Sequence, residues 1–188
     1  MIPAGSFLAL SDGASLLPIH NFSLGLTCQA RGGDALNDGS RGIDTKDWAG
    51  RVSGGSILLS APGVAEAAYT STPGAISATF AFDRNMSPSV VWNTSGDGAY
   101  FRWYDSSVSA FVTTHYATVT RAMVIHDDVR DIANARSDVL LIYQRAGGLY
   151  YRQQRDRYST EYTIRSSLSG NLVSCGMGNK YRILFRMG

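Results

Sequence analysis

The sequence is poor in glutamate and lysine, two residues on which long solvent-exposed helices depend. Glutamate occurs only at Glu66 and Glu161, and lysine only at Lys46 and Lys180. Most of the charge is carried instead by 13 aspartates and 15 arginines, and the net charge is +2. Residues that favour strands, such as tyrosine, valine and threonine, are frequent. This composition predicts an all-β protein with many turns.

Cysteine is also scarce, which removes the usual signals for metal and redox chemistry. The two cysteines, Cys28 and Cys175, are far apart, and their spacing matches neither a zinc knuckle nor a redox centre. We expect two buried free thiols, with a long-range disulfide as the alternative. The aspartate-rich stretch from Asp34 to Asp47 lacks the spacing of a calcium-binding loop, so it predicts a solvated loop. No metal or cofactor is expected.

Motifs for nucleophilic catalysis are missing from the sequence. It has only three histidines and no GxSxG pattern. His126, Asp127 and Asp128 stand where a predicted strand gives way to a turn, and we interpret them as turn-forming and capping residues. A glycan hydrolase would need two carboxylates in a pocket, whereas the aspartates here stand mostly in turn-like contexts. The sequence therefore predicts no enzyme.

The charge pattern and the hydropathy do not indicate nucleic-acid or membrane binding. The net charge of +2 is small for a duplex-binding domain. The basic run Arg152–Tyr158 is interrupted by Asp156, which favours a polar hairpin turn. No apolar stretch approaches the roughly 20 residues that span a bilayer. The N-terminus lacks the basic and apolar regions of a signal peptide, so we expect a chain that folds in a reducing cytoplasm.

The sequence does contain an internal repeat. Ser89–Arg102 reads SVVWNTSGDGAYFR, and Val139–Arg152 reads VLLIYQRAGGLYYR, 50 residues further on and without a gap. Each copy has an apolar run, a glycine-containing turn, and two aromatic residues followed by arginine. Self-similarity at this period is typical of repeated β-meanders. We predict two similar meanders of about 50 residues, with the repeat at residues 89–116 and 139–166.

Hydrophobic periodicity predicts strands along most of the chain after residue 52. In the stretch ISATFAF, Ile76 and every second residue up to Phe82 are predicted to point to one side. Val90–Trp92 and Val139–Tyr143 are apolar on both faces, as central strands are. Further strands are predicted at residues 56–60, 99–104, 109–114, 119–126, 149–154, 158–164 and 180–187. One short helix is predicted at residues 126–137.

These elements predict the fold class and the organisation of the chain. Two meanders are too few for a closed propeller, which needs at least four blades. We predict an antiparallel β-sandwich or β-roll at residues 52–188, with blades completed by other subunits as the alternative. Residues 1–51 are predicted to form a loop-rich arm that packs on a neighbouring subunit. Residues 29–51 are rich in glycine, aspartate and asparagine, and Trp48 is expected to anchor that loop.

The aromatic and arginine residues of the repeat are candidate contact residues. Alternation places Tyr100, Arg102 and Tyr104 on one face of a strand, and Tyr150 and Arg152 on one face of the corresponding strand. Rows of this kind are suited to cross-strand packing, to a protein interface, or to stacking on a sugar. The sequence leaves these three alternatives open.

The second copy also carries a resemblance to a known class of proteins. Asp138–Ile164, DVLLIYQRAGGLYYRQQRDRYSTEYTI, resembles blade-type repeats in structural proteins of tailed bacteriophages, at the tail tip, baseplate or fibre attachment region. The resemblance implies a non-enzymatic virion protein that is made in the bacterial cytoplasm and assembles with copies of itself and with other tail proteins. The expected contact residues are Trp48, Tyr100, Arg102, Tyr104, Tyr150 and Arg152. The alternative function is a carbohydrate-binding module that recognises a cell-surface glycan.

Overall fold

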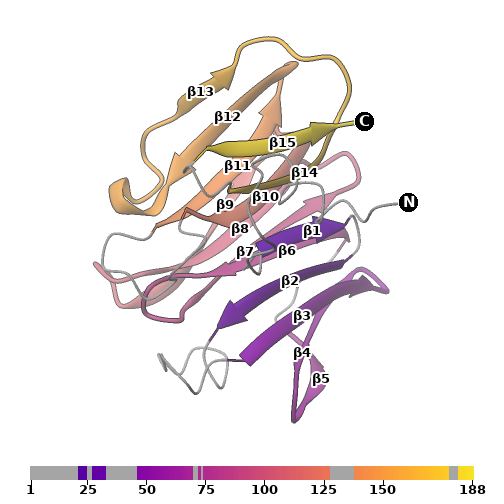
Figure 1. The fold of residues 1–188 in the computed structure, drawn as a ribbon, viewed down its shortest axis with the longest axis vertical. Coiled ribbons are helices and arrows are strands. Elements are labelled where there is room, and N and C mark those ends of the chain that lie inside the picture. The colour runs from indigo at the N-terminus through magenta and orange to yellow at the C-terminus, as the bar shows by residue number, and fades with distance from the viewer. Residues whose placement is uncertain are drawn as a thin grey trace.

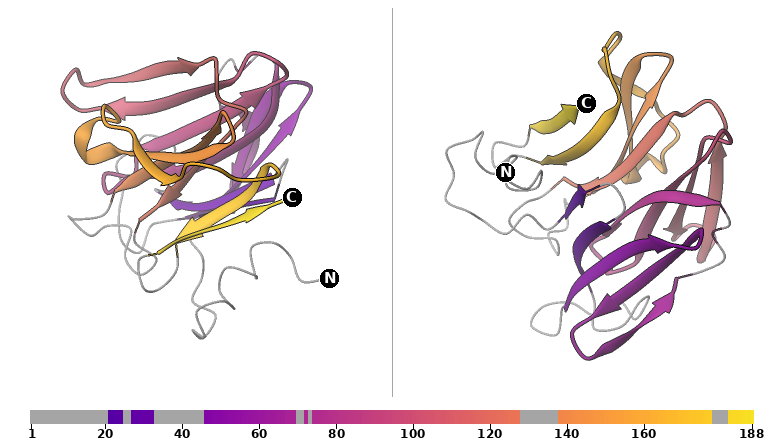
Figure 2. Two further views of the ribbon diagram at one scale, coloured as in Figure 1. Left: turned by 90° about the horizontal axis from the view of Figure 1, so that it is seen from above. Right: turned by 90° about the vertical axis from the view of Figure 1, so that its right-hand side faces the viewer.

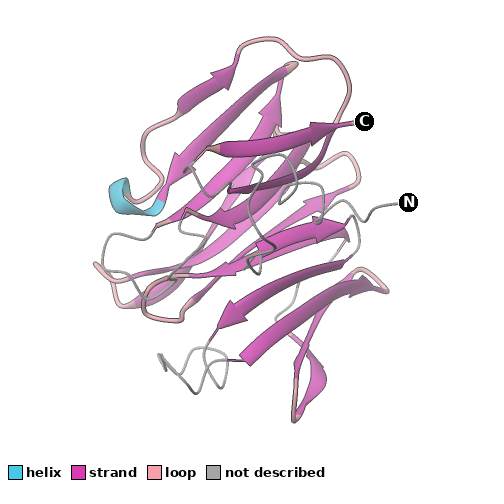
Figure 3. Cartoon of the chain, in the orientation of Figure 1, coloured by secondary structure: helices cyan, strands magenta, loops and turns pink. Residues whose placement is uncertain are grey.

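A computed structural model shows an all-β chain, which confirms the predicted fold class (Figures 1 and 3). The structure describes residues 21–24, 27–32, 46–69, 72, 74–127, 138–177 and 182–188. Within these residues the only helix is a single 3-10 turn, η2, at Gln154–Asp156. Neighbouring strands are antiparallel in every sheet. The predicted helix at residues 126–137 falls almost entirely outside the described residues, apart from His126, which ends a strand, and Asp127.

The strands form four sheets in chain order. The first sheet contains β1 (Asn21–Leu24), β2 (Thr27–Gly32), β3 (Lys46–Ser53), β4 (Ser56–Ala61) and β5 (Val64–Ala68). The second contains β6 (Ala75–Phe82), β7 (Pro88–Thr94), β8 (Ala99–Asp105) and β9 (Ala110–Tyr116). The third contains β10 (Arg121–His126), β11 (Val139–Arg145), β12 (Gly148–Gln153) and β13 (Tyr162–Arg165). The fourth contains β14 (Leu172–Met177) and β15 (Ile183–Met187).

The sheets pack face to face, and a separate apolar core fills each gap. The core between the first and second sheets is built from buried residues that include Trp48, Leu59 and Phe80. The core between the second and third sheets includes Phe101, Leu141 and Tyr158, and the last core lies between the third and fourth sheets. Consequently β6, β7, β10 and β11 are buried on both faces. The continuous apolar runs predict this for β7 and β11, whereas the alternation in β6 predicts a strand buried on one face only.

The first strands of the last three sheets lie next to one another, and the first two strands of the first sheet lie beside them. Strand β2 contacts β6, β6 contacts β10, and β10 contacts β14, while β1 contacts β14. In the right-hand view of Figure 2, the four sheets follow one another around an arc. Successive meanders that pack face to face in this way are similar to neighbouring blades of a propeller.

Amide side chains join the second sheet to the third, and the third sheet to the fourth. Asn93 in β7 donates from Nδ2 to the Ala122 carbonyl (3.1 Å) and accepts from the Ala122 N–H (2.7 Å). Gln144 in β11 donates to the Gly170 carbonyl (2.8 Å) and accepts from the Leu172 N–H (2.9 Å). Each amide replaces the backbone partner that a further strand would provide. We call these contacts the amide bridges.

The two copies of the repeat have equivalent positions in the structure, but the number of residues between equivalent positions is not constant. Val91 and Phe101 point into the core that follows their sheet, and Ile142 and Tyr151 do the same one sheet later. Equivalent positions are therefore 51 residues apart in β7 and β11, and 50 residues apart in β8 and β12. The turn of the second hairpin is one residue shorter. The gapless alignment hides this difference and pairs Asn93 with Tyr143, whereas the structure pairs Asn93 with Gln144.

The first sheet corrects the prediction of a loop at residues 29–51. Residues 29–32 belong to β2 and residues 46–51 belong to β3. Trp48 and Gly50 are buried while Asp47, Ala49 and Arg51 are exposed, so β3 alternates like an ordinary strand. The small and polar residues of its solvent face hide this alternation in the sequence. The predicted domain boundary at residue 51 lies inside β3.

Other predicted strands differ in detail. Ile76 was expected to point inward, but its side chain is 41% exposed because a β-bulge between Ala75 and Ser77 shifts the alternation. The strand predicted from Tyr158 begins at Tyr162, since the preceding residues form η2 and its turn. Strands β5 and β14 were not predicted.

Candidate functional site

The first predicted row of aromatic and arginine side chains packs inside the chain. Tyr100, Arg102 and Tyr104 share one face of β8, as predicted, and that face turns toward the first sheet. The Tyr100 ring stacks between Trp92 and His115, at centroid distances of 5.4 and 4.3 Å. Its hydroxyl donates to Asp97 (2.6 Å). The row therefore forms cross-strand contacts.

Arg102 and Tyr104 continue this packing at the other end of β8. The Arg102 guanidinium lies over the Phe111 ring, 4.8 Å from its centroid, and Tyr104 meets the same ring edge-on at 5.3 Å. Arg102 also interacts with the Tyr69 hydroxyl, although burial dominates and raises the pKa of Tyr69. Phe111 and Tyr69 thus hold the arginine against the sheet.

The second row lies at equivalent positions one sheet later. Arg152 donates from Nη1 to the carbonyls of Tyr158 (2.7 Å) and Ser159 (2.9 Å), and from Nε to the Tyr143 hydroxyl (3.1 Å). Tyr143 donates a short hydrogen bond to Glu161. Burial, reinforced by that bond, raises the pKa of Tyr143 to about 12. Arg152 therefore fixes the turn that follows η2.

Tyr150 and Trp48 also pack against other side chains of the same chain. Tyr150 stacks on Tyr143 at 6.0 Å and lies under the Arg145 guanidinium at 5.1 Å. Trp48 is 2% exposed and packs on Phe82 at 6.4 Å. The expectation that Trp48 is an anchor agrees with this burial. The expectation that it contacts a partner does not, because the neighbouring sheet covers the indole.

The glycines shared by the two copies have different roles. Gly98 has a φ of +74°, and a Cβ there would lie 2.2 Å from the Tyr116 carbonyl oxygen. A Cβ at Gly148 would lie 2.6 Å from the Tyr150 hydroxyl. The first turn therefore needs glycine for its backbone conformation and close approach, whereas a Cβ at Gly148 would require the stacked Tyr150 ring to shift.

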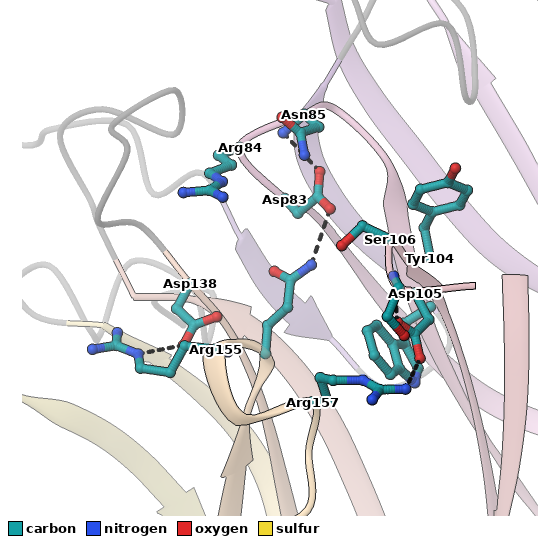
Figure 4. A pocket seen from close by; sticks show the side chains of 12 residues that line it. Asp83, Arg84, Asn85, Tyr104, Asp105, Ser106, Asp138, Arg155 and Arg157 are labelled. Atoms are coloured by element: carbon teal, nitrogen blue, oxygen red, sulfur yellow. Dashed lines mark hydrogen bonds and ion pairs between the residues drawn. The ribbon is translucent and has the colours of Figure 1, made fainter. Parts of the chain in front are cut away.

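A polar cleft of about 510 Å³ opens where hairpin ends of the second sheet meet η2 of the third (Figure 4). Its walls come from four places: the β6–β7 turn, the end of β8 with the turn after it, the residue before β11, and η2 with the residue after it. The residues that line it are Asp83, Arg84, Asn85, Trp103, Tyr104, Asp105, Ser106, Ser107, Asp138, Gln154, Arg155 and Arg157.

Two of the buried aspartates in this cleft form Asx turns and then reach across to the third sheet. Asp83 accepts from the N–H groups of Asn85 (2.8 Å) and Ser87 (2.9 Å), and from Gln154 Nε2 (3.0 Å). Asp105 accepts from the N–H (3.0 Å) and hydroxyl (2.7 Å) of Ser107. The sequence pattern predicts these turns. It does not predict the contacts between sheets, which join residues 52 and 71 positions apart.

Two arginines at the cleft are held from behind by carboxylates. Arg157 Nη2 lies 2.5 Å from Asp105, and Arg155 Nε lies 2.7 Å from Asp138 (Figure 4). The side chains of Arg157 and Arg155 are 60% and 56% exposed, whereas those of Asp105 and Asp138 are 6% and 4% exposed. The hydrogen bond from Arg157 lowers the pKa of Asp105. Burial raises the pKa of Asp138, against the opposing effect of Arg155.

A strained turn positions Arg157. Arg157 and Tyr158 follow η2 with φ values of +58° and +57°, a conformation that side chains other than glycine disfavour. The turn directs Arg157 toward Asp105 and inserts the Tyr158 ring between the sheets. That ring meets Phe101 and Trp103 edge-on, at 4.7 and 4.9 Å. Burial of this ring offsets the backbone strain, which is of order 1–3 kcal/mol per residue.

The chemistry of the cleft is that of a hydrogen-bonding surface. A hydrolase would need a carboxyl group free to give or accept a proton at a substrate. Here each buried carboxylate already accepts from backbone N–H groups or from arginine, which favours its use as a structural acceptor. Among the described residues, no cluster of three or more His, Cys, Asp or Glu side chains is arranged to hold a metal ion.

Comparison with known proteins gave no relative: no family model, no curated protein and no solved structure matches this chain. Within the described residues, no helix is long and apolar enough to cross a membrane. Cys175 is a buried free thiol, as predicted, and burial raises its pKa. The side chain of Cys28 lies outside the described residues.

Proposed function

We propose that this chain is a structural protein of a tailed-phage virion, placed at the tail tip, baseplate or fibre junction. It acts by assembling with copies of itself and with other tail proteins, and it performs no catalysis. In this proposal it is made in the cytoplasm of the bacterial host. The proposal extends the resemblance of Asp138–Ile164 to virion repeats, and one feature of the fold supports it.

That feature is the edge of the fourth sheet. The second strands of the other sheets pair on both sides, but β15 pairs only with β14 among the described residues. The ladder extends to Asn171 and Gly188, which exchange two hydrogen bonds of 2.9 Å. No described strand occupies the outer edge of β15, and we infer that its N–H and C=O groups accept a strand from another chain. Strand addition of this kind is a common mode of protein association.

One face of β15 is already stabilised, which makes the strand a ready template. Ile183, Phe185 and Met187 pack on the core between the third and fourth sheets. Leu184 lies on the opposite face and takes no part in that core. An added strand would extend this core at little ordering cost to the fourth sheet. Specific interfaces usually bury about 1,600 Å² in total, so neighbouring surfaces must also contribute.

The aromatic and arginine rows have a different part in this proposal. Their side chains pack on one another and on neighbouring strands, so they set the shape of the contact surface and add little to the contact itself. The replacement of Arg102 and Arg152 by alanine would test folding before it tested assembly, because Arg152 holds the turn at Tyr158 and Ser159. The edge of β15 gives a cleaner test.

The mass of the purified chain, measured by light scattering with circular dichroism alongside, tests the proposal. We expect a defined trimer or hexamer with a β-rich spectrum. Leu184→Lys places a charge on the edge strand and should yield a folded monomer. The matched control is Val108→Lys, because Val108 is 58% exposed in the β8–β9 turn and lies outside β15; it should keep the parent mass. A wild-type chain that stays a folded monomer at high concentration would contradict self-assembly.

Glycan binding is the second candidate function. Most rings of the rows in β8 and β12 do not favour it, since they are stacked on neighbouring side chains. The polar cleft does favour it, because exposed arginine and serine side chains line it together with Tyr104, the one member of the rows at the cleft.

A further inference from the structure

We propose that the polar cleft between the second and third sheets is a binding site for a neutral saccharide. Arginine and serine side chains would hydrogen-bond to its hydroxyl groups, and the partly exposed ring of Tyr104 would contact an apolar face. This site is separate from the edge of β15, so either proposal can fail while the other holds. Its volume of about 510 Å³ lies in the usual range for small-molecule sites, roughly 300–1,000 Å³.

The balance of charge favours a neutral ligand. Three aspartates and three arginines line the cleft, so its formal charges cancel: Asp83, Asp105, Asp138, Arg84, Arg155 and Arg157. An anion would be attracted by the arginines but repelled by carboxylates that lie directly behind them. A cation meets the reverse arrangement. A ligand with many hydroxyl groups gains hydrogen bonds from both kinds of residue without a charge penalty.

The donors of the cleft are already ordered. Within the described residues, the Arg157 side chain uses only Nη2 for its contact with Asp105, which leaves the N–H groups of Nε and Nη1 for a ligand. Arg155 is fixed by two carboxylates, through Nε to Asp138 and through Nη2 to Asp127 (2.9 Å). An arginine held in this way loses less conformational entropy on binding than a free one.

Hydroxyl and aromatic groups complete the recognition surface. Ser106 is exposed at the mouth of the cleft, beside Asp105. Tyr104 is partly exposed and also lines the cleft, so its ring offers apolar surface to the C–H face of a sugar, whereas Trp103 is only 6% exposed and belongs to the core beneath. Figure 4 shows the Asp105–Arg157 and Asp138–Arg155 pairs on opposite sides of the cleft, with Asp83 between them. Polar groups therefore converge on the same space from several directions.

The site is tested by screening the full chain against an array of neutral and carboxylated oligosaccharides. Binding is then confirmed by saturation-transfer NMR with the neutral disaccharide that scores highest. We expect neutral glycans to bind and Arg157→Lys to weaken them at least about tenfold, because lysine keeps the charge but loses the planar fork. Ser106→Trp should abolish binding by filling the mouth of the cleft.

Arg145→Lys is the matched control. Arg145 pairs with Glu161 at 2.7 Å on the same sheet and is not part of the cleft, so this change should leave binding unaltered. Circular dichroism confirms folding of each variant, and neither cleft variant should alter the mass measured by light scattering. The proposal is overturned if no neutral glycan binds at millimolar concentration, if carboxylated glycans bind tenfold tighter, or if Arg157→Lys has no effect.

Discussion

Replacement of Gln144 by methionine tests whether the amide bridges hold successive sheets together. Methionine is similar in size but cannot bond to the Gly170 carbonyl or the Leu172 N–H, which lie 2.8 and 2.9 Å from the glutamine amide. Gln144 is 5% exposed, so water cannot readily replace it. The Leu172 N–H is buried, and leaving it without a partner costs about 1–3 kcal/mol. Gly170 is exposed, so loss of the bond to its carbonyl costs only about 0.5–1.5 kcal/mol. The two together should lower the free energy of unfolding by roughly 2–4 kcal/mol.

Urea denaturation measures this change, and hydrogen exchange locates it. For a chain of this length, the same loss should lower the Tm by roughly 4–16 °C. The amide proton of Leu172 should exchange much faster in the variant, since its acceptor is gone. Gln153→Met is the control, because Gln153 is only partly buried and bonds to the Tyr162 hydroxyl (3.1 Å). If both variants lose the same stability, or if Leu172 stays protected, the amide bridge does not support the fourth sheet.

Three further perturbations follow from the structure. Gly98→Ala should destabilise the fold by more than about 2 kcal/mol, because the added Cβ would meet the Tyr116 carbonyl. Gly96→Ala is the control: Gly96 also has a positive φ but lies in open space, so this change should cost only about 1 kcal/mol. Urea titration measures both losses of stability. Tyr143 has a pKa raised to about 12, so its contribution to stability is complete below pH 10 and lost between pH 10 and 12. Thermal melts across that range should show a shallower fall for Tyr143→Phe. Asp105 has a lowered pKa, so its contribution is present above about pH 4 and lost as the pH falls further; Asp105→Asn should be less stable at pH 6, with a weaker loss of stability between pH 5 and 2.

Much of the fold could be predicted because apolar patterning is strong in the repeated meanders. Val139–Tyr143 is apolar on both faces, and β11 does lie between two cores. Strand β3 was not predicted, because its inward positions include Gly50, which carries no side chain. Strand β14 escaped because Ser174 and Gly176 break the apolar run of LVSCGM, although most of the strand is buried.

The candidate cleft could be predicted less well, for a physical reason. The Asx turns at Asp83 and Asp105 are local and can be inferred from sequence. The side chains that link these two aspartates into one site are Gln154 and Arg157, which belong to the next sheet. The backbone of Arg157 and Tyr158 is held in its conformation by tertiary packing, and no local propensity favours it. Only the three-dimensional fold brings these groups together.

The contact between β1 and β14 has a consequence for the folding kinetics. Most packing in this chain joins neighbouring sheets, so the early steps of folding need only short excursions of the chain. The contact between β1 and β14 joins segments near the two ends of the sequence, and such a step carries a larger loop-closure entropy. We therefore expect two phases in refolding: a fast one that builds the inner sheets, and a slower one in which the first and last sheets meet.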